Sequence, residues 1–282
     1  MTELTAPATN LADFVTVDAL EEALSNEKYI ADRGLATTLY LTLALRKPLL
    51  LEGEAGVGKT EIAKVLASAL NAPLIRLQCY EGLDASSAIY EWDYPRQMLY
   101  LRTLEATSGL DQDEVRRNLF GEEFLLKRPL LQAIDAAHTQ SPVLLIDEVD
   151  RADQELEAFL LEILSDFQVT VPELGTMKAE HLPIVILTSN RTREIHDALK
   201  RRCLYYWVDF PDFQKEYRIL SAKVPEASDR LATQICAYTQ GLREIDLFKS
   251  PGMAESLDWA RALLALGSNE LNDSVVEDTL GV

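Results

Sequence analysis

The chain has 282 residues, enough for one large domain or two smaller ones, and 48% of them are hydrophobic, which disfavours wholesale disorder. Lysine and arginine total 27 against 46 aspartates and glutamates, for a formal charge of -19. A surface this acidic repels a phosphate backbone, so non-specific nucleic-acid binding is disfavoured unless a local basic patch overrides the net charge.

Targeting signals and cysteine usage both favour a cytoplasmic protein with no membrane span. Residues 1–10 lack the basic start and the apolar stretch of a signal peptide. The apolar run 39–45 is far shorter than a membrane span, and Arg46 ends it. The cysteines, at Cys79, Cys203 and Cys236, are few, odd in number and widely spaced, which argues against a disulfide framework.

Helices and strands are predicted to alternate after a flexible tail at residues 1–12. In chain order we predict helices at 18–26 (with Asp18 as a candidate cap) and 35–45, a strand at 48–51, a helix at 60–70, a strand at 74–77, a helix at 129–137, a strand at 143–146, a helix at 158–167, a hairpin over 168–181, and strands at 184–188 and 204–208. This alternation predicts an α/β fold in which helices cover both faces of a parallel sheet.

The segment 84–128 shows no clear pattern and is predicted to be irregular. Four aromatic residues, Tyr90, Trp92, Tyr94 and Tyr100, lie close together in its first part. Core packing is the favoured role for these side chains, because aromatic residues supply large buried areas. The alternative is that they face a client or partner protein.

The pattern changes after Pro211, where helical segments follow and no strand is predicted over 213–280. We therefore place a domain boundary at 209–212. Residues 13–210 are predicted to form an α/β domain and residues 211–282 a small helical domain.

The phosphate-loop pattern G-x-x-x-x-G-K-[ST] is matched in full by Gly53, Glu54, Ala55, Gly56, Val57, Gly58, Lys59 and Thr60. Its glycines allow a tight turn whose N–H groups point at a phosphate, and the helix that follows adds a favourable dipole. Lys59 is expected to reach the β- and γ-phosphates of ATP, and the Thr60 hydroxyl to hold Mg²⁺. We count Glu61, the next residue, with this nucleotide-binding loop.

Two adjacent carboxylates, Asp147 and Glu148, follow the apolar strand 143–146. Ligands bind at the carboxyl edge of open α/β sheets, so both acids are expected at the site. Asp147 would hold the Mg²⁺ shell and Glu148 would polarise the attacking water. An ordinary charged loop is the alternative, but the phosphate loop favours the catalytic interpretation.

Polar residues also follow the strand 184–188. Asn190 is a candidate for orienting the same water, although a turn-forming asparagine is the alternative. A basic cluster comes next, with Arg191, Arg193, Lys200, Arg201 and Arg202. Guanidinium groups suit a transferring phosphoryl group, but interleaved acids make a solvated, salt-bridged face an equal alternative.

These motifs together resemble those of AAA+ ATPases. Residues 53–60 are similar to Walker A, 143–148 to Walker B, 188–190 to sensor 1 and 198–203 to the arginine-finger segment. Within AAA+, segments 159–164, 167–171 and 182–186 resemble the MoxR group, and segments 77–84, 90–95 and 195–203 resemble its CoxD-like subfamily of carbon monoxide dehydrogenase accessory proteins. The resemblance covers about residues 15–270.

The resemblance implies an AAA+ P-loop domain with a central parallel sheet flanked by helices, followed by an all-helical lid. It implies ATP and Mg²⁺ as cofactors and a ring of subunits, usually a hexamer, in which Arg202 or Arg201 reaches the γ-phosphate bound by a neighbour. It also implies a partner protein with a von Willebrand factor A domain. The client would be a metalloenzyme, a molybdenum hydroxylase whose metal centre is completed with this help.

The sequence departs from the MoxR pattern at the start of the lid helix. Other members carry a sensor 2 arginine after a Ser-Pro pair, whereas here Gly252 follows Ser250 and Pro251. Arg261, further along the helix, is a candidate substitute, and how the lid senses nucleotide is left open.

We therefore expect an ATPase that converts ATP and water to ADP and phosphate and remodels other proteins. The alternative is a nucleotide-dependent binding switch with little turnover, although such a switch does not need Glu148. A third possibility, an enzyme acting on nucleic acid, is disfavoured by the -19 charge and by the lack of a basic-aromatic strip.

Overall fold

The computed structural model describes residues 14, 16–105, 112–245, 247 and 249–279. The tail predicted at residues 1–12 lies outside these ranges. Within them, no helix combines the length and the apolar character that crossing a bilayer requires.

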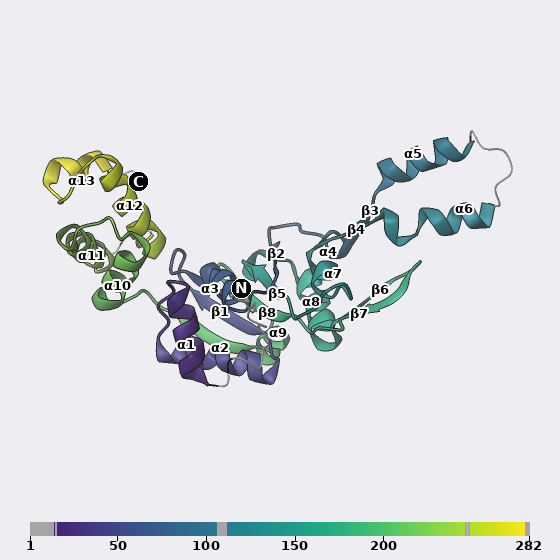
Figure 1. The fold of residues 1–282 in the computed structure, drawn as a ribbon, viewed down its shortest axis with the longest axis horizontal. Coiled ribbons are helices and arrows are strands. Elements are labelled where there is room, and N and C mark those ends of the chain that lie inside the picture. The colour runs from purple at the N-terminus through teal and green to yellow at the C-terminus, as the bar shows by residue number, and fades with distance from the viewer. Residues whose placement is uncertain (1–13, 15, 106–111, 246, 248, 280–282) are drawn as a thin grey trace, which may run out of the picture.

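A five-stranded parallel sheet forms the centre of the molecule, in the order β2-β5-β8-β1-β9 (Figure 1). The strands are β1 (Leu49–Gly53), β2 (Leu74–Gln78), β5 (Val143–Asp147), β8 (Ile184–Ser189) and β9 (Leu204–Val208). Every residue of β1, β5 and β8 is buried, because helices cover both faces of the sheet. The predicted α/β fold is confirmed.

Two groups of helices cover the two faces. On one side the sheet packs against α1 (Val17–Asn26), α2 (Arg33–Leu45) and α3 (Lys59–Ala69). On the other side it packs against α4 (Ala85–Ile89), α7 (Pro129–Ala133), α8 (Gln154–Asp166) and α9 (Asp197–Arg202). The helix predicted at 129–137 is thus shorter than expected.

The cap of α1 is not the predicted Asp18. The side chain of Thr16 accepts a hydrogen bond from the Ala19 N–H at 3.1 Å, so the helix begins at Val17. Asp18 lies in the first turn, where its carboxylate still interacts favourably with the helix dipole and pairs with Arg33.

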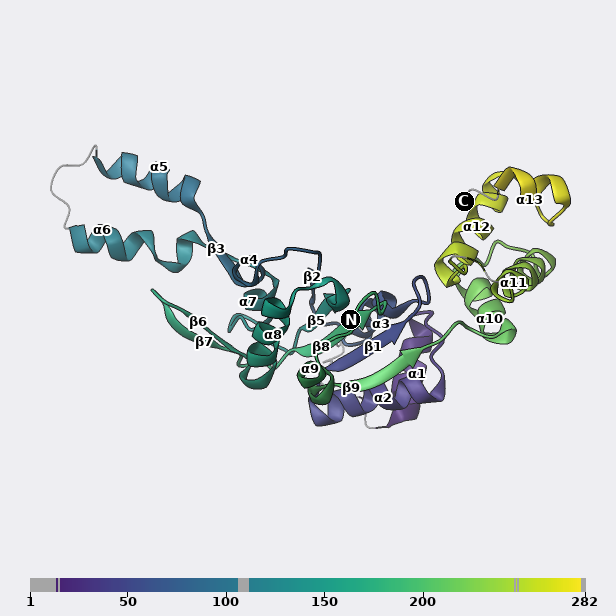
Figure 2. The ribbon, with the colours of Figure 1, turned by 180° about the vertical axis from the view of Figure 1, so that it is seen from behind.

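The described parts of the segment 84–128 (84–105 and 112–128) contain regular helices and strands, so the prediction that it is irregular is wrong. Besides α4 it contains β3 (Tyr90–Trp92), α5 (Tyr94–Glu105), α6 (Gln112–Leu119), η2 (Glu122–Phe124) and β4 (Leu125–Lys127). Helices α5 and α6 project from the body on the β3–β4 ribbon (Figures 1 and 2).

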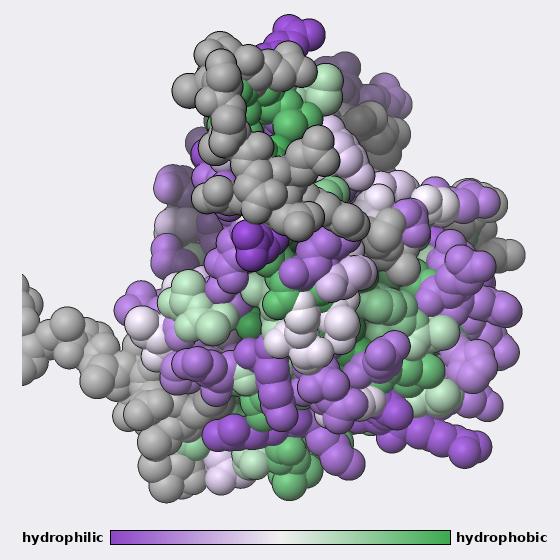
Figure 3. All heavy atoms as spheres, turned by 90° about the vertical axis from the view of Figure 1, so that its right-hand side faces the viewer, coloured by the Kyte–Doolittle hydropathy of each residue, from purple (hydrophilic) through white to green (hydrophobic). Residues whose placement is uncertain are grey.

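The aromatic residues of this segment divide between two environments. Trp92 packs edge-on against Phe120 with ring centroids 5.2 Å apart, and Tyr100 packs against Phe124 at 5.4 Å. Core packing is therefore confirmed for Tyr90 and Trp92, which pack against the hydrophobic cluster on one face of the sheet, whereas Tyr100 packs on Phe124 beside the projecting helices and Tyr94 is 65% exposed. Figure 3 views the molecule from this end and shows hydrophobic residues interspersed among hydrophilic ones.

The predicted hairpin and the predicted C-terminal helices are both present. Strands β6 (Gln168–Val171) and β7 (Gly175–Lys178) pair antiparallel. The chain ends in α10 (Phe213–Lys223), α11 (Asp229–Arg243), α12 (Met253–Ala265) and α13 (Asp273–Thr279). These helices share a hydrophobic cluster of their own, separate from the two clusters on the sheet faces.

A buried carboxylate holds the C-terminal helices together. Glu216 is fully buried and accepts hydrogen bonds from both terminal nitrogens of Arg243, at 2.7 and 2.9 Å, and from Ser256 at 2.6 Å. Arg243 also donates to the Pro251 carbonyl at 2.8 Å and lies over the Phe210 ring at 5.0 Å. One ion pair thus links α10 and α11 to the start of α12 and to the segment that leaves the sheet.

Replacing Arg243 by methionine is expected to lower the free energy of unfolding of the C-terminal helices by about 3–5 kcal/mol, because Glu216 is left buried and unpaired. Urea denaturation followed by tryptophan fluorescence measures the loss. The matched control is Arg230→Met, which removes an exposed pair with Glu270 and is expected to cost less than about 1 kcal/mol. Equal losses for the two variants would contradict the structural importance of the buried pair.

Candidate functional site

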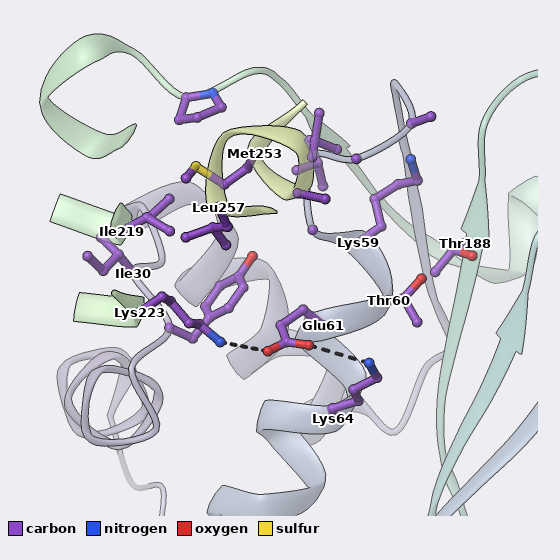
Figure 4. A pocket seen from close by; sticks show the side chains of 18 of the residues that line it. Ile30, Lys59, Thr60, Glu61, Lys64, Thr188, Ile219, Lys223, Met253 and Leu257 are labelled. Atoms are coloured by element: carbon purple, nitrogen blue, oxygen red, sulfur yellow. Dashed lines mark hydrogen bonds and ion pairs between the residues drawn. The ribbon is translucent and has the colours of Figure 1, made fainter. Parts of the chain in front are cut away.

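A cavity of about 470 Å³ lies between the carboxyl edge of the sheet and the C-terminal helices (Figure 4). From the sheet side it is lined by the phosphate loop and by the ends of β5 and β8. From the other side it is lined by α10 and α12. The predicted site residues that line it are Ala55, Gly56, Val57, Gly58, Lys59, Thr60, Glu61, Asp147, Glu148 and Asn190.

The phosphate loop turns where the sequence places glycine. A Cβ added to Gly53 would lie 2.2 Å from the Val208 carbonyl oxygen of the neighbouring β9, so the strand pairing leaves no room for a side chain. Gly58 has φ +96 and precedes α3 without any side-chain cap. The first N–H groups of α3 are therefore available to an anion, as a helix N-terminus that binds phosphate requires.

Lys59 is buried, and its ammonium group bonds to the loop itself. Nζ donates to the Gly53 carbonyl at 2.8 Å and to the Glu54 carbonyl at 2.6 Å. Burial lowers the pKa of Lys59, and the carboxylates of Asp150 and Glu54 partly offset this effect. The ammonium is thus held at the mouth of the loop, within the cavity that a phosphate group would enter.

The carboxylate of Asp147 is buried at the end of β5 and is 3% exposed. Its Oδ1 accepts hydrogen bonds from the hydroxyls of Thr60 at 3.0 Å and Thr188 at 2.5 Å. The Thr60 hydroxyl and the Asp147 carboxylate are hard oxygen donors side by side next to the phosphate loop. This donor set fits Mg²⁺, which prefers one or two protein oxygens together with phosphate and water.

Glu148 follows in the left-handed conformation, with φ +55, and its side chain is 31% exposed. Its N–H donates to the Thr188 hydroxyl at 2.9 Å, which fixes the backbone where β5 and β8 end. Its carboxylate lies 3.2 Å from the Arg151 guanidinium. The residue expected to activate water thus has a left-handed backbone angle that residues with a side chain rarely adopt.

Asn190 lines the cavity and is held there by an acid that the sequence interpretation missed. Asp150 is 2% exposed and accepts from the Asn190 N–H at 3.2 Å, and from the N–H and hydroxyl of Thr192 at 2.8 and 2.7 Å. A buried carboxylate needs such partners. The sequence feature that could have identified Asp150 is its position: it is a third acidic residue, two positions after Glu148, on the same predicted loop.

The basic cluster at 191–202 does not converge on this cavity. Arg193 pairs with the buried Glu157, and Arg191 lies over the Trp207 ring at 5.6 Å. Arg202, on α9, donates to the Leu161 carbonyl at 2.6 Å. Arg201 is exposed and makes no contact of this kind within the described part of the chain. Arg201 and Arg202 are therefore not among the residues that line the cavity.

The C-terminal helices touch the phosphate loop directly. The Ala254 N–H, at the start of α12, donates to the Gly56 carbonyl at 3.1 Å. Gly252 packs so closely that an added Cβ would lie 2.7 Å from the Gly56 backbone. The start of α12 is thus packed directly against the phosphate loop, which leaves no room for a side chain at position 252. Arg261, further along α12, lines the cavity and pairs with Asp258 at 3.0 Å.

Ion pairs close the opposite side of the cavity. Lys223 of α10 bonds Glu61 of α3 at 2.7 Å, and Lys64 lies 3.5 Å from the same carboxylate (Figure 4). Burial alone raises the pKa of Glu61, but the hydrogen bond and charge of Lys223 outweigh it and hold that pKa below its ordinary value. The apolar side chains of Ile219, Met253 and Leu257 also line the cavity, and a flat aromatic ring could pack against them.

The substitution Gly252→Ala tests the contact between α12 and the phosphate loop. The new methyl group has no room, so we expect the free energy of unfolding to fall by about 1–3 kcal/mol. Thermal denaturation measures this change. The control is Gly241→Ala in α11, where no atom lies within 4 Å of the added Cβ and stability should stay level or rise. Equal behaviour of the two variants would show that the contact is not close.

The chain is similar to proteins of two staphylococci over most of its length. The chain is 26% identical over 250 residues to an uncharacterized protein of Staphylococcus haemolyticus, covering 86% of this chain and 85% of the relative. It is 27% identical over 229 residues to an uncharacterized protein of Staphylococcus aureus, covering 79% and 77%.

Solved structures share the fold. A point mutant of Thermotoga maritima RuvB matches with a TM-score of 0.52 at 15% identity, over 97% of this chain and 72% of that chain. The structure described as the Thermotoga maritima RuvB Holliday junction branch migration motor matches with a TM-score of 0.50 at 15% identity, over 97% and 71%. At this identity the likeness shows the fold alone.

The family itself is shown by the model of the AAA domain, dynein-related subfamily, which matches residues 48–203. That match runs from the strand before the phosphate loop to the end of α9 and spans more than half of the chain. It therefore includes the phosphate loop, Asp147, Glu148 and Asn190. The chain belongs to the AAA domain family, in its dynein-related subfamily.

Proposed function

We propose that this protein is an ATP hydrolase that uses turnover to remodel other proteins. The observation that carries the proposal is the single cavity in which the phosphate loop, the Thr60–Asp147 pair and Glu148 meet. We further propose that residues 13–210 form the nucleotide-binding domain and residues 211–282 a lid. The separate hydrophobic cluster of α10 to α13 supports that division.

Each residue of the cavity has a defined part in the proposed reaction. The N–H groups of the phosphate loop bind the phosphates, and Lys59 exchanges its loop carbonyls for them. Thr60 and Asp147 would hold Mg²⁺. When bound, Mg²⁺ neutralises charge on the β- and γ-phosphates and orients them.

Hydrolysis itself requires a water beside the γ-phosphate. Glu148 takes a proton as the water oxygen bonds to the γ-phosphorus, the bond to the β-phosphate oxygen breaks, and ADP and phosphate leave. Asn190, anchored by Asp150, orients the water. Arg261, on the lid helix, is placed to sense nucleotide where the usual arginine position holds Gly252.

The AAA fold suggests a ring of subunits, and we propose a hexamer. Arg201 and Arg202 lie outside their own cavity, which suits a role at the site of a neighbouring subunit. Arg201 supports this best, because it is exposed and makes no contact within the described part of the chain.

The finer assignment rests on the sequence resemblance to MoxR and CoxD-like proteins. We propose a cytoplasmic chaperone that acts with a von Willebrand factor A protein on a molybdenum hydroxylase. Neighbouring genes that encode such a pair would support this client. RuvB is described as a branch migration motor, but at 15% identity that likeness extends only to fold, and a charge of -19 disfavours a nucleic-acid substrate.

The alternative function, a nucleotide switch with little turnover, has one observation in its favour. In this state Glu148 faces Arg151, and Lys59 is held by carbonyl groups of the loop, so neither group is poised for reaction. Against it stands the position of Glu148 in the cavity lining, which a switch does not need.

The deciding experiment measures ATPase rate per subunit against protein concentration. We expect the wild-type rate to climb with concentration and to fall by about 100-fold or more in Glu148→Gln, which lacks the base. Arg201→Ala and Arg202→Ala identify the arginine that acts across the interface.

Mixing provides the internal control. An equimolar mixture of Glu148→Gln and the inactive arginine variant should regain part of the rate, because some sites then combine an intact Glu148 with an intact arginine. A monomeric variant that hydrolyses ATP as fast as wild type would refute shared sites. A flat, near-zero wild-type rate despite tight ATP binding, persisting with the partner protein added, would favour the switch.

A further inference from the structure

We infer that Arg76 is a positioning residue of the metal site, which holds the Asp147 carboxylate in the metal-free state and competes with Mg²⁺ for it. The inference rests on the proposed function, because it assigns a role at the same site. Arg76 lies on β2, outside the phosphate loop and outside the loops after β5 and β8.

Strand pairing places Arg76 beside the carboxylate. Strand β2 runs parallel to β5, with Gln78 opposite Asp147 and Arg76 opposite Leu145. Residues two apart on a strand share a face, so the side chains of Arg76 and Gln78 lie on the same side of β2. The Gln78 amide oxygen accepts from Arg76 Nη2 at 2.5 Å and steadies the guanidinium.

The guanidinium group of Arg76 donates two hydrogen bonds to the same carboxylate oxygen of Asp147. Its Nε lies 3.1 Å and its Nη2 2.5 Å from Oδ2. The other oxygen, Oδ1, is occupied by the hydroxyls of Thr60 and Thr188. Arg76 therefore occupies Oδ2, the carboxylate oxygen that does not bond to Thr60 or Thr188 and that a metal ion or its bound water would otherwise contact.

Charge explains why a partner is needed here. Asp147 is 3% exposed, and a buried carboxylate without a counter-charge is unfavourable. Lys59 does not supply that charge, since its ammonium bonds to the carbonyls of Gly53 and Glu54. Within the described ranges, Arg76 is the only cation in contact with the Asp147 carboxylate.

The difference in exposure between Arg76 and Asp147 indicates which of the two side chains moves when Mg²⁺ binds. Arg76 is 50% exposed and can move its charge into water, whereas Asp147 stays in the site. Loading Mg²⁺ must therefore break two charge-assisted hydrogen bonds, and unloading it restores them. Arg76 raises the Mg²⁺ concentration that nucleotide binding requires and favours release of the metal with ADP.

The test uses the full chain and a fluorescent ADP, N-methylanthraniloyl-ADP, at fixed concentration, with Mg²⁺ titrated from a chelator-buffered start. The measured quantity is the Mg²⁺ concentration at half-maximal ADP binding. For Arg76→Gln we expect it to fall by a factor of about three to ten, as befits a half-exposed charged pair. Arg76→Lys keeps the positive charge but cannot donate two hydrogen bonds from a planar group. For this variant we expect the Mg²⁺ midpoint to fall less, by about twofold.

The matched control is Arg128→Gln. Arg128 is 44% exposed and pairs with Glu91 at 2.6 Å, so it resembles Arg76 in exposure, but its partner Glu91 is 43% exposed and does not line the cavity, whereas Asp147 does. We expect its Mg²⁺ midpoint to equal that of wild type. A purely structural ion pair at Arg76 would change the melting temperature of the protein without moving this midpoint.

The outcomes separate this inference from the proposed function. If wild type binds the labelled ADP and Arg76→Gln has an unchanged or raised Mg²⁺ midpoint, the inference is overturned and the nucleotide site stands. If wild type fails to bind the labelled ADP even at saturating Mg²⁺, the proposed function fails and the inference with it. If Arg76→Gln does not fold, Arg76→Lys decides by the same comparison.

Discussion

The pairing of β1 between β8 and β9, with β5 on the far side of β8, is the constraint on which the site depends. Because all of these strands are parallel, the phosphate loop, Asp147, Glu148 and Asn190 must emerge at one edge. The close approach of Gly53 to the Val208 carbonyl belongs to the same pairing. The gathering of these residues is thus a consequence of strand order, while α10 and α12 close the cavity from the other side.

Buried carboxylates outside the reaction fix the loops at that edge. Asp150 ties the loop after β8 to the loop after β5, and Glu157 binds Arg193 and the His196 N–H. Each carboxylate is buried and fully supplied with donors, so each specifies one loop geometry. Part of a basic cluster that looked functional in the sequence is therefore a structural clamp.

The C-terminal helices are coupled to the site through backbone and charge together. The Glu216–Arg243 pair holds the start of α12, and α12 in turn bonds the Gly56 carbonyl of the phosphate loop. Lys223 and Glu61 make a second connection across the cavity. The phosphate loop and the C-terminal helices are therefore joined by two independent sets of contacts, one of backbone and one of charge.

Local pattern determined the elements and the phosphate loop, because a fully buried strand, an amphipathic helix and a glycine-rich turn each leave a signature in neighbouring residues. The sequence by itself also determined which residue types stand at the ends of the strands. It missed every element of the segment 84–128, namely α4, β3, α5, α6, η2 and β4, and it misplaced the cap of α1 by two residues. Only the tertiary structure decided the contacts between distant segments: Arg76 with Asp147, Asp150 with Asn190, Gly252 with Gly56, and the separation of Arg201 and Arg202 from their own cavity. These contacts depend on strand order and on the docking of helices, which join residues far apart in the chain and leave no periodic trace in it.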